Sequence, residues 1–87
     1  MSLFAKIFDI TADDQVLVTI QGEIYGEYEL IEETDIDNER VMMTTTYNNY
    51  RDALIAFNRY AIEDAMTFFF IDAPTIPYVD DQENDID

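Results

Sequence analysis

The sequence predicts an α+β domain, in which an antiparallel meander of three to four strands is followed by one long helix packed on one sheet face. Two patterns predict this class: apolar residues first recur with period two between short polar turns, and later recur at helical spacing. Composition supports a folded chain, since 48% of residues are apolar and 14% are aromatic, too many for a disordered acidic polymer. With 87 residues there is room for one core.

Four segments have the composition of strands separated by turn residues. The second is the clearest, because Val16, Val18 and Ile20 alternate with polar side chains. Gly22 and Gly26, the only two glycines, indicate a connection or a bulge before the third strand. The expected strands are Leu3–Ile10, Gln15–Gln21, Glu27 to about Asp35, and Arg40–Tyr47.

A helix of about 20 residues is expected after the fourth strand, where the period of the apolar residues changes. Asn48 or Asn49 can cap its start, and Asp52 lies near the positive end of the helix dipole. Pro74 and Pro77 prevent it from continuing. The residues at helical spacing are Leu54, Phe57, Ala61, Ala65 and Phe68. Residues 1–79 are therefore expected to form a single domain, and the acid-rich residues 80–87 a disordered tail.

The sequence offers little equipment for catalysis. It has no Cys and no His, and it lacks a glycine-rich phosphate loop and a nucleophile elbow, so we expect no enzyme and no cofactor. Asp35, Asp37 and Glu39 begin a calcium-loop spacing, but Arg40 replaces the turn glycine and Thr46 the closing Glu, which argues against a metal site. No apolar run has the length of a signal peptide or a membrane span, so a cytoplasmic protein is expected.

Charge is the strongest functional signal. Twenty Asp and Glu against four Lys and Arg give a net charge of -16. Such an excess repels nucleic-acid phosphates and anionic membranes and attracts proteins with basic grooves. We therefore expect the partner to be a basic nucleic-acid-binding protein, and no nucleic acid or membrane to be bound directly.

The acids between residues 23 and 39 occupy odd positions, with Glu32 as the one exception, while Tyr28 and Leu30 occupy even positions. On a strand this alternation would send carboxylates to solvent in a row with steps of about 6.5–7 Å. Such a row roughly imitates a nucleic-acid strand, whose phosphates are about 3.4 Å apart along the axis. The alternative is a solvated outer sheet face with ordinary strand tyrosines. The candidate partner-binding residues are Glu23, Tyr25, Glu27, Tyr28, Glu29, Glu33, Asp35, Asp37 and Glu39.

In size, charge, order of elements and acidic tail, the chain resembles the small inhibitors that phages and mobile elements encode, such as anti-CRISPR proteins and DNA-mimic antirestriction proteins. The resemblance is one of layout, without a residue signature. It implies that the chain covers the nucleic-acid-binding surface of a CRISPR effector or restriction nuclease. We therefore expect a non-enzymatic inhibitor that is a monomer or homodimer. An alternative is an assembly or adaptor subunit that docks through the apolar segment Phe68–Val79, including Phe69, Phe70 and Tyr78. A cation-dependent module is a third possibility.

Overall fold

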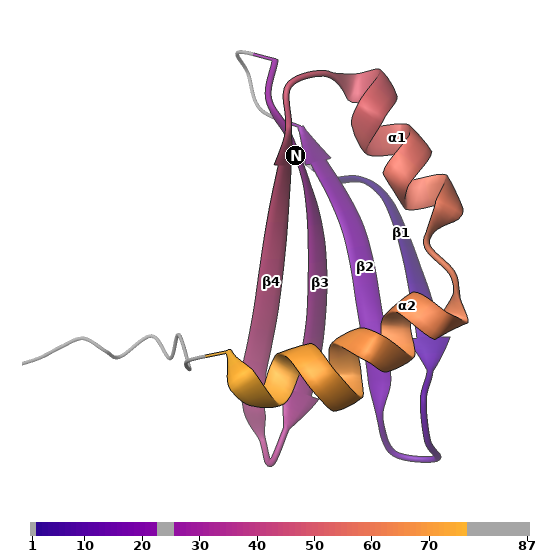
Figure 1. The fold of residues 1–87 in the computed structure, drawn as a ribbon, viewed down its shortest axis with the longest axis vertical. Coiled ribbons are helices and arrows are strands. Elements are labelled where there is room, and N and C mark those ends of the chain that lie inside the picture. The colour runs from indigo at the N-terminus through magenta and orange to yellow at the C-terminus, as the bar shows by residue number, and fades with distance from the viewer. Residues whose placement is uncertain (1, 23–25, 77–87) are drawn as a thin grey trace, which may run out of the picture.

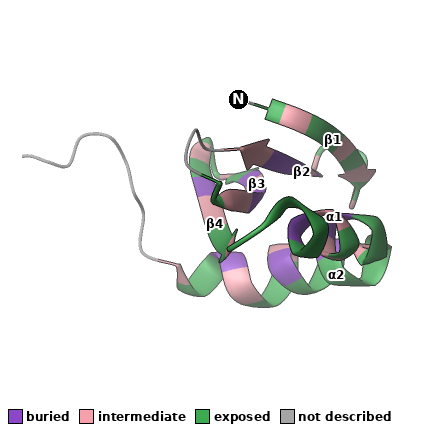
Figure 2. Cartoon of the chain, turned by 90° about the horizontal axis from the view of Figure 1, so that it is seen from above, coloured by how far each residue is buried: buried purple, intermediate pink, exposed green. Residues whose placement is uncertain are grey.

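A computed structural model describes residues 2–22 and 26–76 and confirms the α+β class. Four antiparallel strands follow one another in the order β1-β2-β3-β4, and the helical segments lie together on one side of the sheet (Figures 1 and 2). The elements are β1 (Ser2–Asp9), β2 (Gln15–Gly22), β3 (Tyr28–Ile36), β4 (Glu39–Tyr47), α1 (Tyr50–Arg59), α2 (Ile62–Thr67), the π-helical turn η1 (Phe68–Asp72) and the 3-10 turn η2 (Ala73–Thr75). The acidic tail predicted at residues 80–87 lies outside the described residues.

The pairing register assigns each side chain to one face of the sheet, because residues opposite each other in an antiparallel pair point the same way. The covered face, which the helices pack on, carries the buried Val16, Val18 and Ile20 of β2. The open face carries Ile7 of β1 and, opposite it, Leu17 of β2. The alternation in the sequence therefore correctly predicts the buried side of the second strand.

A two-residue turn joins β3 to β4. Asp37 and Asn38 both have positive φ angles, 53° and 67°, and Ile36 pairs with Glu39 on either side of them. Two central residues with positive φ are typical of a type I′ hairpin, and Asp and Asn tolerate this conformation better than most other residues. The turn thereby fixes the register of the whole β3–β4 pair.

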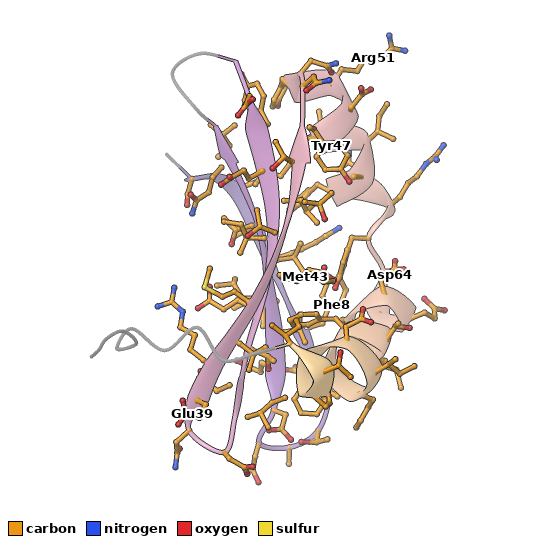
Figure 3. All side chains as sticks on the ribbon, turned by 60° about the vertical axis from the view of Figure 1, so that its left-hand side comes forward. Phe8, Glu39, Met43, Tyr47, Arg51 and Asp64 are labelled. Carbon is orange, nitrogen blue, oxygen red and sulfur yellow. The ribbon has the colours of Figure 1, made fainter. Side chains whose placement is uncertain are left out.

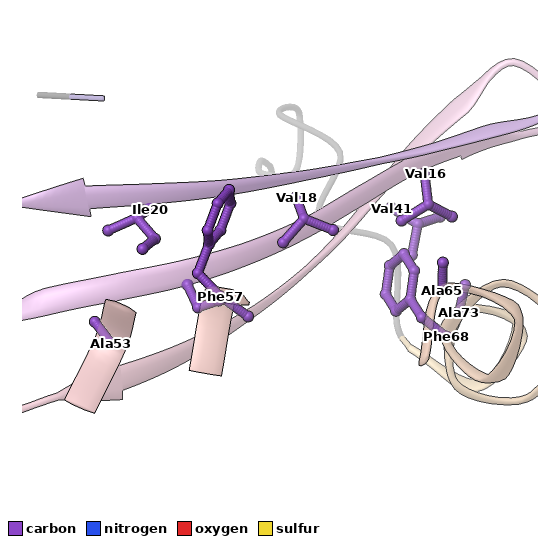
Figure 4. Close-up of a cluster of buried hydrophobic side chains, with 10 residues drawn as sticks. Val16, Val18, Ile20, Val41, Ala53, Phe57, Ala65, Phe68 and Ala73 are labelled. Carbon is purple, nitrogen blue, oxygen red and sulfur yellow. The ribbon is translucent and has the colours of Figure 1, made fainter. Parts of the chain in front are cut away.

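The core is one cluster of buried apolar side chains, which Figure 4 shows between the sheet and the helical segments. At one end, Ala53 and Phe57 of α1 lie near Ile20. At the other end, the fully buried Phe68 lies near Val16 with two small residues of α2 and η2. Burying a side chain such as Phe68 stabilises the fold by about 1.5–3 kcal/mol. The helical segments are thus held to the sheet through different parts of one shared core.

The single long helix predicted from the sequence is wrong: the chain forms two short helices with an extended break at Tyr60 and Ala61. We attribute much of this difference to Lys6 of β1, because its ammonium group donates hydrogen bonds to the carbonyl oxygens of Phe57 and Tyr60. The Ala61 N–H instead donates a hydrogen bond of 2.9 Å to the Asp64 carboxylate, and Ala61 is the N-cap residue of α2. A continuous helix would need that N–H for the Phe57 carbonyl.

The beginning of α1 agrees with the sequence. Asn49 caps the helix, and its side-chain oxygen accepts a hydrogen bond of 2.9 Å from the Asp52 N–H. None of the helices within residues 2–22 and 26–76 is both long and apolar enough to cross a membrane.

Candidate functional site

Three of the predicted acidic residues share the open face of the sheet. Glu29, Glu33 and Asp35 alternate along β3 with side chains that point to the covered face. The row is interrupted at its second position, because Ile31 occupies the open face there and is buried. On the open face, Glu33 and Asp35 therefore form one close pair of carboxylates, and Glu29 lies further along the strand. This row of acids is shorter than the one expected from the sequence.

A basic residue opposes this row from the neighbouring strand. Arg40 pairs with Asp35 across β3 and β4, and its Nε lies 2.8 Å from the Glu33 carboxylate. Exposed ion pairs contribute about 0–1 kcal/mol and are screened by salt. Arg40 thus lowers the negative potential around Glu33 and leaves Glu29 and Asp35 as the less compensated charges.

A pocket of about 290 Å³ lies at the end of the open face where the β1–β2 turn meets β3. We call it the acidic pocket. Its lining combines two apolar side chains with four carboxylates, of which Asp14 also accepts a hydrogen bond of 2.7 Å from the Thr11 hydroxyl. The lining residues are Ile7, Asp13, Asp14, Gln15, Leu17, Glu33, Thr34 and Asp35. This combination suits a side chain with an aliphatic stem and a cationic end.

Asp13 and Asp14 belong to the turn between β1 and β2 and are not among the binding residues expected from the sequence. Their position could have been inferred, because in an antiparallel meander the first and third turns lie at the same end of the sheet. That geometry brings the β1–β2 turn close to Asp35 and to the β3–β4 turn.

Tyr28 lies apart from the acidic residues. It points to the covered face, is half-buried, and packs its ring 5.5 Å from the ring of Tyr50 in α1. Its contacts are those of a residue at the margin of the core. Tyr25 and Glu23, the neighbouring candidates in sequence, lie outside the described residues.

The remaining candidates lie away from the row on the open face. Glu39 pairs with Ile36 and therefore points toward the covered side, so the parity of the sequence does not continue across the turn. Figure 3 shows Glu39 near the turn end of β4, far from Tyr47 at the other end. Asp37 occupies the turn itself, and Glu27 is exposed just before β3.

A second polar cluster lies beneath the junction of the two helices. In the middle of the covered face, Lys6 and Glu32 flank Val18 in one cross-strand row. Glu32 is only 7% exposed and accepts a hydrogen bond of 2.5 Å from the Tyr60 hydroxyl. Sequence reasoning missed this site, although Glu32 was the one acid that broke the alternation.

The environment of Glu32 favours its neutral form. Burial raises the pKa of the Glu32 carboxyl, and nearby Asp72 and Asp64 raise it further, while the hydrogen bond from Tyr60 opposes the shift. The pKa of Tyr60 is also raised, mainly by burial and by its hydrogen bond to Glu32. The tyrosine therefore remains protonated and serves as the donor.

A pocket of about 390 Å³ opens beside this cluster, between the helices and strands β3 and β4. We call it the junction pocket. Figure 3 shows Tyr47 beside α1 and Asp64 on α2, both on the helix side of the sheet. The lining residues are Leu30, Glu32, Met43, Tyr47, Ala56, Arg59, Tyr60, Asp64, Thr67 and Asp72.

Within the two described ranges, no group of three or more His, Cys, Asp or Glu is arranged to hold a metal ion. No protein-family model, curated protein sequence or solved structure matches the chain.

Proposed function

We propose that this chain is a non-enzymatic inhibitor, encoded by a phage or mobile element, that acts in the bacterial cytoplasm. Its target is the nucleic-acid-binding surface of a host defence protein, either a CRISPR effector or a restriction nuclease. The observation that carries the proposal is the net charge of -16 together with the acids Glu29, Glu33 and Asp35 on the sheet face opposite the described helices.

The physical argument begins with long-range attraction. A strongly negative protein is steered toward a basic groove, and the lysines and arginines that neutralise phosphates can equally contact carboxylates. On contact, the acidic pocket accepts one basic side chain of the target, whose methylene groups pack on Ile7 and Leu17 while its charge meets Asp35. Nucleic acid and the inhibitor would then compete for the same lysine and arginine side chains of the target.

The first experiment is a pull-down from bacterial lysate with the tagged protein, at low and high salt and with or without competing duplex DNA. We expect the tagged protein to retain a nucleic-acid-binding protein at low salt. Duplex DNA and high salt should displace this partner, because both weaken contacts between carboxylates and basic side chains. A partner that is still retained at high salt and in the presence of duplex DNA would contradict nucleic-acid mimicry.

A pair of variants with equal charge then tests the surface. Glu29→Gln with Asp35→Asn removes two open-face charges and leaves the Arg40–Glu33 pair in place. Asp52→Asn with Glu63→Gln removes two exposed charges from the helices and serves as the control. We expect only the open-face variant to lose the target. If both variants lose target binding equally, binding depends on net charge alone. If both variants retain it equally, the open face is excluded as the binding surface.

One observation favours the adaptor alternative. Ile62, Met66 and Phe70 recur every four residues along α2 and η1 and are 39%, 45% and 55% exposed, and the adjacent Ile71 is 64% exposed. Such an apolar stripe is typical of a docking surface. Phe69 is half-buried against the core, and Tyr78 lies outside the described residues. In this case binding would survive high salt and would be lost in a Met66→Ser, Phe70→Ser variant.

A further inference from the structure

The junction pocket contains a buried acceptor that the fold leaves unsatisfied. Tyr60 donates to one carboxylate oxygen of Glu32, Oε2, and no other hydrogen bond or ion pair reaches this side chain from residues 2–22 and 26–76. A carboxylate that is 7% exposed with only one donor is costly, since buried polar groups are normally hydrogen-bonded. The second oxygen, Oε1, therefore needs a donor.

The pocket around Glu32 has an excess of negative charge. Asp64 and Asp72 line it, and within the described ranges neither forms an ion pair. Arg59 is the one cation in the lining, and it too forms no ion pair with the described residues. Lys6 lies nearby, but its ammonium group is already bonded to the carbonyls that end α1.

Apart from Thr67, the remainder of the lining is apolar or aromatic. Leu30, Met43 and Ala56 contribute hydrocarbon surface, and Tyr47 and Tyr60 contribute aromatic rings. The volume of about 390 Å³ lies within the range of about 300–1,000 Å³ that is usual for small-ligand sites. Guanidinium groups stack on aromatic rings and bind carboxylates through a planar fork of donors.

We propose that the junction pocket binds a guanidinium group on an aliphatic stem, with the cation directed at Glu32, Asp64 and Asp72 and the stem against Leu30 and Met43. The pocket is lined from the covered face and is separate from the acidic residues of the open face. The inference therefore stands independently of the inhibitor proposal.

Protonation supports this assignment. Because burial raises the pKa of Glu32 above its ordinary value of 4.5, a bound cation would lower it again and release a proton. Affinity should therefore increase as pH rises above 4.5, and Glu32→Gln should remove the part of this dependence that belongs to Glu32. The charged and titratable groups that face Glu32 or its pocket are Lys6 of β1, Tyr47 of β4, Arg59 at the end of α1, Tyr60 after it, Asp64 of α2 and Asp72 of η1.

The test is an NMR titration of the whole protein with n-butylguanidinium and with n-butylurea, a planar neutral analogue of similar shape. We expect saturable shifts of junction-pocket resonances with the cation at about millimolar concentration, and no saturation with the urea. Equal binding of the two compounds, or no saturable binding of the cation, would overturn the proposal.

Two variants of equal charge locate the effect. Asp64→Asn with Asp72→Asn should weaken n-butylguanidinium binding by about tenfold or more, because hydrogen bonds to charged groups are lost. Asn at position 64 can still accept from the Ala61 N–H, so α2 keeps its cap. The control Asp52→Asn with Glu63→Gln should leave the affinity within about twofold. Equal affinities of the two variants would overturn the proposal, and the wild-type comparison with n-butylurea decides it even if the pocket variant fails to fold.

A third ligand, N-acetylarginine amide, distinguishes the source of the group. Binding as tight as that of n-butylguanidinium indicates an arginine presented by a partner protein, and clearly weaker binding indicates a free alkylguanidine. Both results support guanidinium recognition.

Discussion

Tyr60→Phe tests the buried cluster most directly. The change removes only the hydroxyl that donates to Glu32 and keeps the ring, which packs 5.6 Å from the ring of Phe8. Loss of the donor leaves a carboxylate that is 7% exposed without any hydrogen bond from the described residues. We expect the free energy of unfolding to fall by about 1–3 kcal/mol at neutral pH, a large share of the stability of a small domain.

The loss of stability caused by Tyr60→Phe should depend on pH. The hydrogen bond from Tyr60 lowers the pKa of Glu32, so its removal raises that pKa further. A group whose pKa is raised in the folded state contributes full stability below its unfolded value and loses it as pH rises through the folded value. The difference between Tyr60→Phe and the wild type should therefore be smallest below pH 4.5 and increase above it.

Urea denaturation followed by circular dichroism across this pH range measures the effect. Tyr47→Phe is the matched control, because Tyr47 lines the same pocket and its hydroxyl forms no hydrogen bond with the described residues. In a Glu32→Gln background, Tyr60→Phe should cost only about 0.5–1.5 kcal/mol, as for a neutral hydrogen bond. A cost independent of pH, or the same cost in both backgrounds, would refute the reasoning.

Three further predictions concern stability, each measured by urea denaturation. Glu32→Gln should make the protein at least as stable as the wild type at neutral pH, because it removes a carboxyl group whose pKa is raised by burial. For the same reason, the decline in stability above pH 4.5 should be smaller in this variant than in the wild type. An unchanged dependence of stability on pH would contradict this prediction. Lys6→Met should destabilise the fold by about 1–3 kcal/mol, because the Tyr60 carbonyl loses its donor and the Phe57 carbonyl keeps only the Tyr60 N–H; a cost below about 0.5 kcal/mol would assign the helix break to another cause. Asn38→Val should cost about 1–2 kcal/mol, since its φ of 67° disfavours β-branched residues, whereas Asn38→Gly should be nearly neutral.

Local patterns were sufficient to predict the sheet. Alternation along β2 identifies Val16, Val18 and Ile20 as the buried side, and Asn49 is recognisable as a helix cap. These features depend on neighbours in sequence, whose spacing sets the direction of each side chain.

The helix break and the junction pocket depend on distant residues. The apolar spacing from Leu54 to Phe68 is continuous, and nothing in that segment indicates that Lys6, more than fifty residues earlier, would take the carbonyls that end α1. The covered-face acid Glu32 was visible as a break in the alternation, but its partner Tyr60 could be identified only once the helix was placed.

The extended residues Tyr60 and Ala61 separate α1 from α2. No helical hydrogen bond bridges them, and α1 and η1 pack against different parts of the core, near Ile20 and near Val16 (Figure 4). We therefore expect α2 and η1 to open locally while α1 and the sheet remain folded. The amide hydrogens of α2 and η1 should then exchange with solvent faster than those of the central strand β2.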